Sequence, residues 1–348
     1  MPHSPNTLFD PTTLAEAFPD AVSSGHIDGI DPHRTPYEEL GRKFSEHQMS
    51  LGIAAQAGVS VDTATAVANL MNTTAHHSLD SLLGSSLEGR LFAETAKSVH
   101  RTMDDLLRKT GDVFALPGLD SPEFKNTNWQ RLHEATKAYE QLGIESAVVF
   151  APINRPLDGT HGWRTFFSGL RQWQDKAQPN ATNKLQNQND GDGLWINSEI
   201  SDQWDSVIDT SPSAPQWQVS VVPVTDKAPV VSVAHDGTDA QGNVPPELQH
   251  MLGLLPPTPN TGTVPKLASH PKAESLLTIH AMRHFEGKDP IDGKIGGSYY
   301  WSWAEGTINN GAVGLAVGWG PDSGRVYLYR CGVGGRGGLL GVRPEVRG

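Results

Sequence analysis

Cysteine is almost absent from this sequence: 348 residues include a single one, Cys331. A disulfide needs two thiols, and structural zinc or iron–sulfur sites built on cysteine need several. One chain can therefore form none of these. The opening stretch MPHSPNTLFDPTTLAEAF also lacks a basic segment followed by an apolar one, so it does not resemble a secretory signal. Together these two absences favour a reducing, cytoplasmic setting.

Basic charge and long apolar runs are scarce as well. Lys and Arg total 27 against 39 Asp and Glu, which gives a formal net charge of −12 at pH 7. Because phosphates and anionic lipids repel an acidic protein, we expect it to bind neither nucleic acid nor membrane surfaces. No apolar run approaches the roughly 18 residues that a membrane-spanning helix needs, so no such helix is predicted.

Complete catalytic or nucleotide-binding motifs are missing too. The sequence holds no G-x-S-x-G and no P-loop. Gly332, Gly334 and Gly337 do match G-x-G-x-x-G, but a dinucleotide site requires a helix directly after the glycines. The few residues that follow include Pro344 and further glycines, which leave no room for that helix. We therefore expect no cofactor and interpret residues 332–348 as a flexible Gly/Arg-rich tail.

Two histidines at helical spacing are the clearest metal-like pattern. His280 and His284 lie four residues apart on a helix predicted over 271–286, which places both imidazoles on one face. Zinc proteases use H-E-x-x-H, whose glutamate is the general base, but Ala281 occupies that position here. A third ligand would have to come from His270, Asp289 or Asp292. The other interpretation is a histidine pair that interacts with the helix dipole, so no metal site is assigned.

Other polar clusters each have an ordinary structural interpretation beside the chemical one. The segment HIDGIDPH places four metal-ligating side chains in a polar lead-in, and His76 and His77 point in different directions at a predicted helix end. Cys331 lies near Arg330 and Arg336, which could activate a thiol, but a buried strand position explains it equally well. A solvated helix face is the simplest explanation of the carboxylates Glu199, Asp202, Asp205 and Asp209.

The first third of the chain is predicted to be helical. Residues 1–35 are rich in Pro, Asp, His and Ser and indicate an extended lead-in. Three segments with helical apolar spacing follow, over residues 37–58, 60–77 and 87–109, separated by Gly and Ser. We predict that they form a helical module covering residues 36–115.

The remainder is typical of a mixed α/β domain over residues 125–331. A helix over 128–143 is stopped by Gly143 and followed by a buried strand over 144–153. Residues 176–193 are nearly free of apolar side chains and predict a long exposed Asn/Gln-rich loop. Three strands separated by turn signals then end the domain as an antiparallel β-meander over 297–306, 312–320 and 324–331. The predicted fold class is α+β.

Aromatic residues alternate along the first strand of that meander. Tyr299, Trp301 and Trp303 are spaced two apart and are therefore predicted to point to one face, with Trp319 on the next strand. This stripe could pack the sheet against the 271–286 helix, or it could form an exposed surface for a protein partner.

Three segments of the second half resemble an uncharacterised actinobacterial domain family. They are the helix-to-strand stretch YEQLGIESAVVFAPI, the HP before a helix in LASHPKAESLL, and the Trp-bearing strand YYWSWAEG. The resemblance covers roughly residues 125–330, and the chain departs from it in its glycine-rich ending with one cysteine. It implies a cytosolic protein and no particular activity.

These patterns favour one class of function and leave a second one open. The favoured hypothesis is a non-catalytic cytosolic binding or scaffold protein that uses the aromatic strand face. The alternative is a metal-assisted hydrolase built on His280 and His284.

Overall fold

The computed structural model describes residues 87–157, 162–188, 191–209, 211, 213–256, 270–336 and 338–348. The chain divides into two compact units at Leu87 and Glu88, and the second unit is the one described here. The lead-in, the first two predicted helices, the HIDGIDPH segment and the His76–His77 pair lie outside the described residues.

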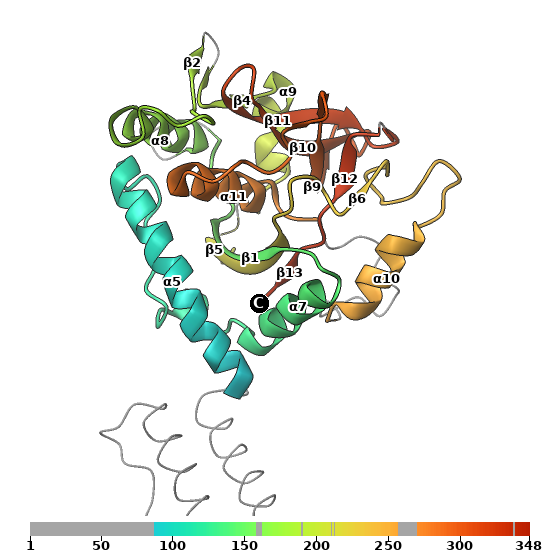
Figure 1. Cartoon of the computed structure of the whole chain (residues 1–348), viewed down its shortest axis with the longest axis horizontal. Helices are drawn as coiled ribbons and strands as arrows, with labels where there is room; N and C mark the ends of the chain where they lie inside the picture. Colours follow the sequence, from blue (N-terminus) through green and yellow to red (C-terminus); the bar gives the residue numbers. More distant parts are fainter. Residues whose placement is uncertain are drawn as a thin grey trace, which may run out of the picture. The chain divides into compact units, whose positions relative to one another are not determined.

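Helices and strands both contribute, so the predicted α+β class is confirmed (Figure 1). The helices are α5 (Leu87–Thr110), α6 (Pro122–Lys125), α7 (Trp129–Gln141), α8 (Trp163–Ala177), α9 (Ser198–Gln203), α10 (Pro246–Leu254) and α11 (Ala273–Glu286). A 3₁₀ turn at Trp204–Ser206 extends α9.

In the described part of the chain, the strands form two main sheets and two small hairpins. The three-stranded sheet has the order β1 (Ser146–Pro152), β5 (Trp217–Pro223) and β13 (Val346–Arg347). The six-stranded sheet has the order β4 (Leu194–Ile196), β11 (Arg325–Gly332), β10 (Val313–Gly320), β9 (Trp301–Ile308), β12 (Leu340–Val342) and β6 (Val230–Val231). The hairpins are β2 (Asn187–Gln188) with β3 (Gly191–Asp192), and β7 (Lys294–Ile295) with β8 (Ser298–Tyr299).

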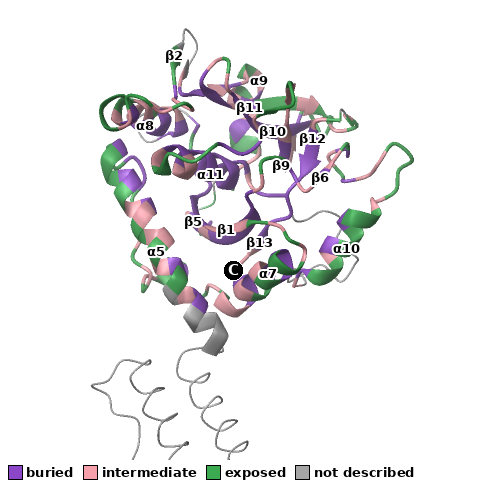
Figure 2. Cartoon of the chain, in the orientation of Figure 1, coloured by how far each residue is buried: buried purple, intermediate pink, exposed green. Residues whose placement is uncertain are grey.

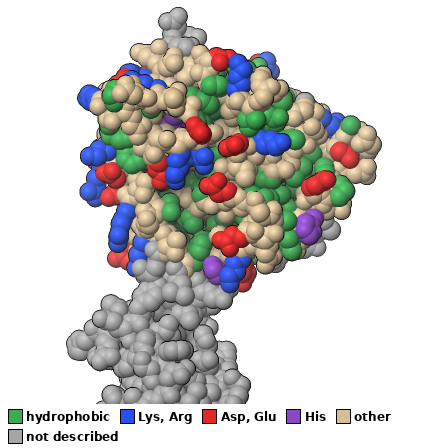
Figure 3. Space-filling view, in the orientation of Figure 1, with side chains coloured by type: hydrophobic (Ala, Val, Ile, Leu, Met, Phe, Trp, Pro, Cys, Tyr) green, Lys and Arg blue, Asp and Glu red, His purple; other side chains and the backbone are tan. Residues whose placement is uncertain are grey.

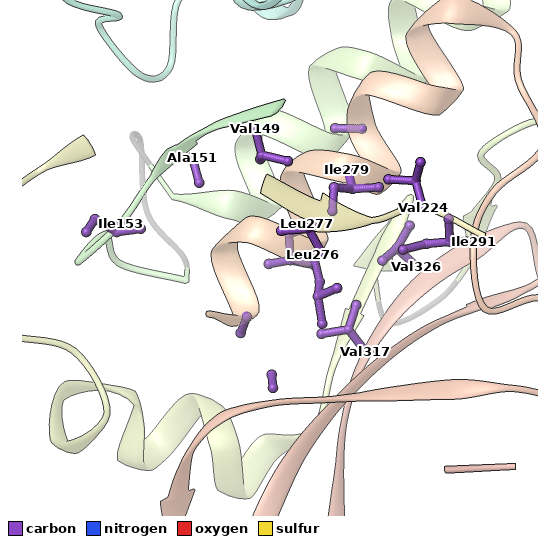
Figure 4. Packing of buried hydrophobic residues seen from close by; sticks show 14 of the residues in the cluster. Val149, Ala151, Ile153, Val224, Leu276, Leu277, Ile279, Ile291, Val317 and Val326 are labelled. Carbon is purple, nitrogen blue, oxygen red and sulfur yellow. The ribbon is translucent and has the colours of Figure 1, made fainter. Parts of the chain in front are cut away.

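Helix α11 lies between the two sheets and is the centre of the core. It is buried on nearly all sides, as Figure 2 shows, because apolar residues occupy more than one of its faces. Leu276, Leu277 and Ile279 pack between Val149 of β1 and Val317 of β10 (Figure 4). Helix α7 covers the other side of the three-stranded sheet, so the layers run α7, small sheet, α11, large sheet (Figure 1).

The helix-to-strand unit and the meander both match the sequence prediction. Asn128 caps α7 by accepting a hydrogen bond from the Arg131 N–H, and Gly143 ends the helix region with a positive φ of 68°. Strands β9, β10 and β11 pair antiparallel in sequence order. The sheet then grows by a parallel strand beside β11 and another beside β9, which local sequence patterns did not indicate.

The prediction of a flexible tail after Cys331 is wrong. Residues 340–347 form β12 in the large sheet and β13 in the small one, so this segment joins the two sheets. The side chain of Arg343 is fully buried and forms a 2.7 Å ion pair with Asp292. Glu345 is also buried and accepts hydrogen bonds from Ser220 and Ser275. The glycine content indicated a flexible backbone, but pairing with the distant strands β9 and β5 holds this segment in place.

The third predicted helix belongs with the α+β unit and not with a separate helical module. Ala96, Met103 and Leu106 of α5 are buried in the same core as the sheets. At its end, α5 meets α8 so closely that a Cβ on Gly169 would overlap the Thr110 carbonyl oxygen. The predicted boundary near residue 115 therefore falls instead at Leu87 and Glu88.

The described part of the Asn/Gln-rich segment 176–193 runs from the end of α8 to the β2–β3 hairpin and is anchored at one point. Leu185 is buried, and its N–H donates to the side-chain carbonyl of Gln174 at 3.0 Å. The short hairpin β2–β3 completes the segment.

Candidate binding surface

Four aromatic side chains gather on the face of the large sheet that points away from α11. We call them the aromatic patch: Trp195 of β4, Trp301 of β9, and Tyr327 and Tyr329 of β11. Leu194 and Ile196 flank Trp195, and Val326 and Leu328 alternate with the tyrosines; all four are buried in the core. Because side chains alternate across a strand, the aromatic residues between them point outward.

The rings of the patch touch one another across the sheet. The Trp195 ring stacks on Tyr329 with centroids 5.8 Å apart and an interplanar angle of 29°. Trp301 meets Tyr329 at 5.7 Å and 41°, and Tyr327 at 5.9 Å and 76°. These separations are those of favourable aromatic pairs, so the patch is one continuous cluster.

Small residues on the central strand let the rings lie low over the sheet. Gly318 pairs with Tyr327 and Ala316 pairs with Tyr329. A Cβ on Gly318 would lie 2.7 Å from Trp301 Cε3, which is closer than real carbon contacts allow. Trp301 therefore depends on the absence of a side chain there, and Gly318 is required by close approach.

The patch is partly open to solvent and keeps unused hydrogen-bond donors. Tyr329 is 45% exposed, and the other three side chains are half-buried. Within the described residues, no hydrogen bond uses the Tyr329 hydroxyl or the indole N–H of Trp195 or Trp301, whereas the Tyr327 hydroxyl donates to Ser323. The surface therefore combines apolar ring faces with polar edges that can donate to a ligand.

A shallow depression beside Trp195 borders the patch on the α9 side. Its walls include Arg164, Asn197, Ser201 and Asp202. Asp202 and the nearby Asp205 are exposed, and neither forms an ion pair with another described residue. Glu199, in contrast, is paired with Arg330 at 3.0 Å. The border beside Trp195 therefore carries the exposed Asp202 carboxylate together with the partly buried Arg164 guanidinium.

The aromatic stripe expected from the sequence is divided by the structure. Trp301 and Trp303 do share the outer face, but the loop carrying Val233 and His235 covers Trp303, whose indole donates to the Val233 carbonyl at 2.9 Å. Tyr299 lies in the β7–β8 hairpin, where its hydroxyl donates to Asp322. Trp319 points to the opposite face and packs against His284 of α11, with the two ring centroids 4.5 Å apart.

His280 and His284 lie on α11 as predicted, but both are fully buried. Burial lowers the pKa of His284 to about 4, and its Nδ1 contacts the Asn183 carbonyl at 2.9 Å. Burial and the neighbouring His284 hold the pKa of His280 well below its usual range. Both imidazoles are therefore neutral at pH 7.

The polar candidates that lie among the described residues are each held by other contacts. In the described part of the chain, no group of three or more His, Cys, Asp or Glu side chains is placed to hold a metal ion. His270, one of the proposed third ligands, instead contacts the His235 carbonyl, and burial lowers its pKa to about 4. Asp292 pairs with Arg343. Burial raises the pKa of Cys331, which disfavours a reactive thiolate at neutral pH.

Sequence reasoning missed three of the four patch residues. The alternation of Tyr327 and Tyr329 within GRVYLYR was a usable signal, because it places both rings on one face of a predicted strand. Trp195 carried no such signal, since its strand is three residues long and joins the sheet through parallel pairing with β11.

Comparisons with known proteins return no relatives: no family model, no curated protein and no solved structure matches this chain. The resemblance to the actinobacterial family therefore stays a prediction. Among the described residues, no helix is long and apolar enough to cross a membrane.

Proposed function

We propose that this protein is a non-catalytic, cytoplasmic binding protein and that the aromatic patch is the surface that binds a protein partner. The observation that carries the proposal is the cluster of four aromatic side chains, in which each tryptophan contacts both tyrosines, on an incompletely buried sheet face. Large exposed aromatic groups are costly to leave in water, and they are typical anchors of protein interfaces.

The distribution of charge supports a protein partner over a nucleic acid. The net charge is −12, and on the face drawn in Figure 3 acidic and basic side chains are interspersed without a continuous basic area. A nucleic-acid surface would need such an area to offset phosphate repulsion. The single, half-buried cysteine supports the cytoplasmic setting.

Affinity capture with matched variants tests this function. Wild-type protein, Trp195→Ala and Tyr329→Ala are compared as baits in extracts of the source cells, with Leu254→Ala as the control. Leu254 of α10 is 39% exposed, so its variant removes apolar surface away from the patch. We expect one partner retained by wild type and by the control, and lost from both patch variants. A partner retained equally by all four baits, or captured by none of them, would refute a role for the patch.

A further inference from the structure

We propose that a small pocket between α5, β1 and α11, separate from the aromatic patch, binds a free α-amino acid with an apolar side chain. The pocket combines an apolar interior, an unpaired carboxylate and an unpaired guanidinium at its rim, and the open edge of a strand. An apolar amino acid presents a matching group to each of these features. The inference goes beyond protein binding and concerns a different surface, so either proposal can fail without the other.

The interior of the pocket is apolar and has the size of one side chain. Val99 and Met103 line it from α5. Val149 of β1 and Ile279 of α11, both labelled in Figure 4, line it together with Met282. The pocket volume is about 150 Å³, and a dry cavity of about that size holds one benzene ring. It therefore fits the side chain of leucine or phenylalanine, and the two flexible methionines allow it to adjust to either.

Two opposite charges border the pocket at the same place. Alternation along the strand puts the Glu145 side chain on the face of Val149, which is the face that packs on α11. Arg283 of α11 is held in position because its guanidinium donates to the carbonyls of Asp289 and Val224. The N–H of Val224 in turn donates to the Glu145 carbonyl at 2.8 Å. Glu145 and Arg283 therefore both lie beside Val224.

Neither charge has a counter-charge among the described residues. In that part of the chain no ion pair or hydrogen bond uses the Glu145 carboxylate, and the Nη2 group of Arg283 has no partner. The other charged residues of the lining, Glu286 and Lys288, neutralise each other in an ion pair at 2.8 Å. A free amino acid supplies both missing partners, since its carboxylate pairs with a guanidinium and its ammonium with a carboxylate. A simple acid or amine would leave one of the two charges unpaired.

The outer edge of β1 supplies backbone groups for the same ligand. β1 is an edge strand, and the bond from Val224 to Glu145 shows that the backbone groups of Glu145 and of every second residue after it face β5. Those of Val148 therefore project from the open edge. Because the pocket touches Val148 and Val149, which belong to opposite faces of β1, it lies along this edge. The Val148 N–H can donate to the ligand carboxylate, and its C=O can accept from the ammonium.

Calorimetric titration of the full chain with L-leucine and L-phenylalanine tests the inference. Three comparison compounds each remove one recognised group: N-acetyl-L-leucine has no ammonium, L-leucinamide has no carboxylate, and L-serine has no apolar side chain. We expect L-leucine or L-phenylalanine to bind at millimolar concentration or below. The three comparison compounds should bind at least about tenfold more weakly, because each forfeits an ion pair or the burial of the apolar group.

Variants locate the site, with circular dichroism to confirm that each is folded. Glu145→Gln and Arg283→Gln should each weaken binding about tenfold, and Val99→Phe should abolish it by filling the pocket. The control Arg108→Gln removes an exposed guanidinium of α5 that lies outside the pocket, and it should bind as wild type does.

The outcome rests mainly on Glu145→Gln, because Glu145 is exposed and the variant leaves the packing unchanged. It decides the test if Arg283→Gln does not fold. Absence of binding by both apolar amino acids overturns the inference. Equal binding of N-acetyl-L-leucine or L-leucinamide also overturns it, as does unchanged affinity in Glu145→Gln or an equal loss in Arg108→Gln.

Discussion

Replacing Arg343 by Ala tests how far the C-terminal segment holds the fold together. The guanidinium donates to Asp292 and Ser302, each at 2.7 Å, and to the backbone carbonyls of Pro223 and Thr225. Both members of the ion pair are completely buried. Removing the cation leaves the Asp292 carboxylate without its counter-charge in a dry site, and that kind of loss costs roughly 3–5 kcal/mol.

Urea unfolding followed by tryptophan fluorescence measures this cost. The matched control is Arg330→Ala, which removes the same side chain from an ion pair with Glu199 in which both groups are about 40% exposed. Exposed pairs contribute about 0–1 kcal/mol, so the control should unfold close to wild type. The free energy of unfolding of Arg343→Ala should be lower by several kcal/mol.

A second variant separates the charge from the packing. Asp292 has a positive φ of 50°, a conformation that Asn tolerates, so Asp292→Asn can be combined with Arg343→Met without new backbone strain. The double variant has no unpaired buried charge and should recover part of the stability lost in Arg343→Ala. If Arg343→Ala destabilises the protein no more than Arg330→Ala does, residues 340–347 are not packed between the two sheets as described.

Two further predictions concern the core. Because burial lowers the pKa of His270 and His284 to about 4, the folded state resists their protonation. Stability is therefore fully present above the unfolded pKa of about 6.5 and is lost as pH falls toward 4, by about 2 kcal/mol for each histidine at pH ~5. Urea unfolding at about pH 7 and about pH 5 checks this. The variant His284→Gln should show a smaller difference in the free energy of unfolding between these two pH values. Trp303→Ala should lower the free energy of unfolding by about 3–5 kcal/mol, because the side chain is fully buried. Trp195→Ala should lower it much less, and equal melting temperatures for the two variants would contradict the division between core and patch.

The local patterns that the sequence revealed were those with short-range causes. The α11 and α7 helices follow apolar spacing and end at Gly287 and Gly143, which both adopt positive φ. The meander follows turn signals between alternating strands. The elements that the sequence did not predict depend on contacts between distant residues. Strands β4 and β12 pair in parallel with β11 and β9, which lie far from them along the chain. Composition suggested a free tail because glycine is flexible, and no local pattern showed that Arg343 and Glu345 would be buried beside distant partners.

The same failure explains why only one patch residue was foreseen. Alternation predicted correctly that Trp301 and Trp303 share one face, since both lie on β9. Whether an outward face remains open depends on what the rest of the chain places over it. The loop with Val233 and His235 closes over Trp303 but leaves Trp301 half-exposed. The alternation of residues within one strand does not show whether another segment packs over the outward face.

The C-terminal segment couples stability to the proposed binding surface. The backbone N–H of Trp301 donates to the Leu339 carbonyl at 2.8 Å, and the next residue, Leu340, begins the pairing of β12 with β9. Four residues after Leu339, Arg343 forms the buried ion pair with Asp292, and the Tyr139 hydroxyl of α7 donates to the Pro344 carbonyl at 2.6 Å. Loosening this segment should therefore disturb Trp301 as well as lower stability. Removing residues 332–348 should abolish binding through loss of the fold, whereas Tyr329→Ala should abolish it with the fold intact. Only the second result identifies a surface, so the side chains that argue for binding are those whose removal leaves the unfolding curve unchanged.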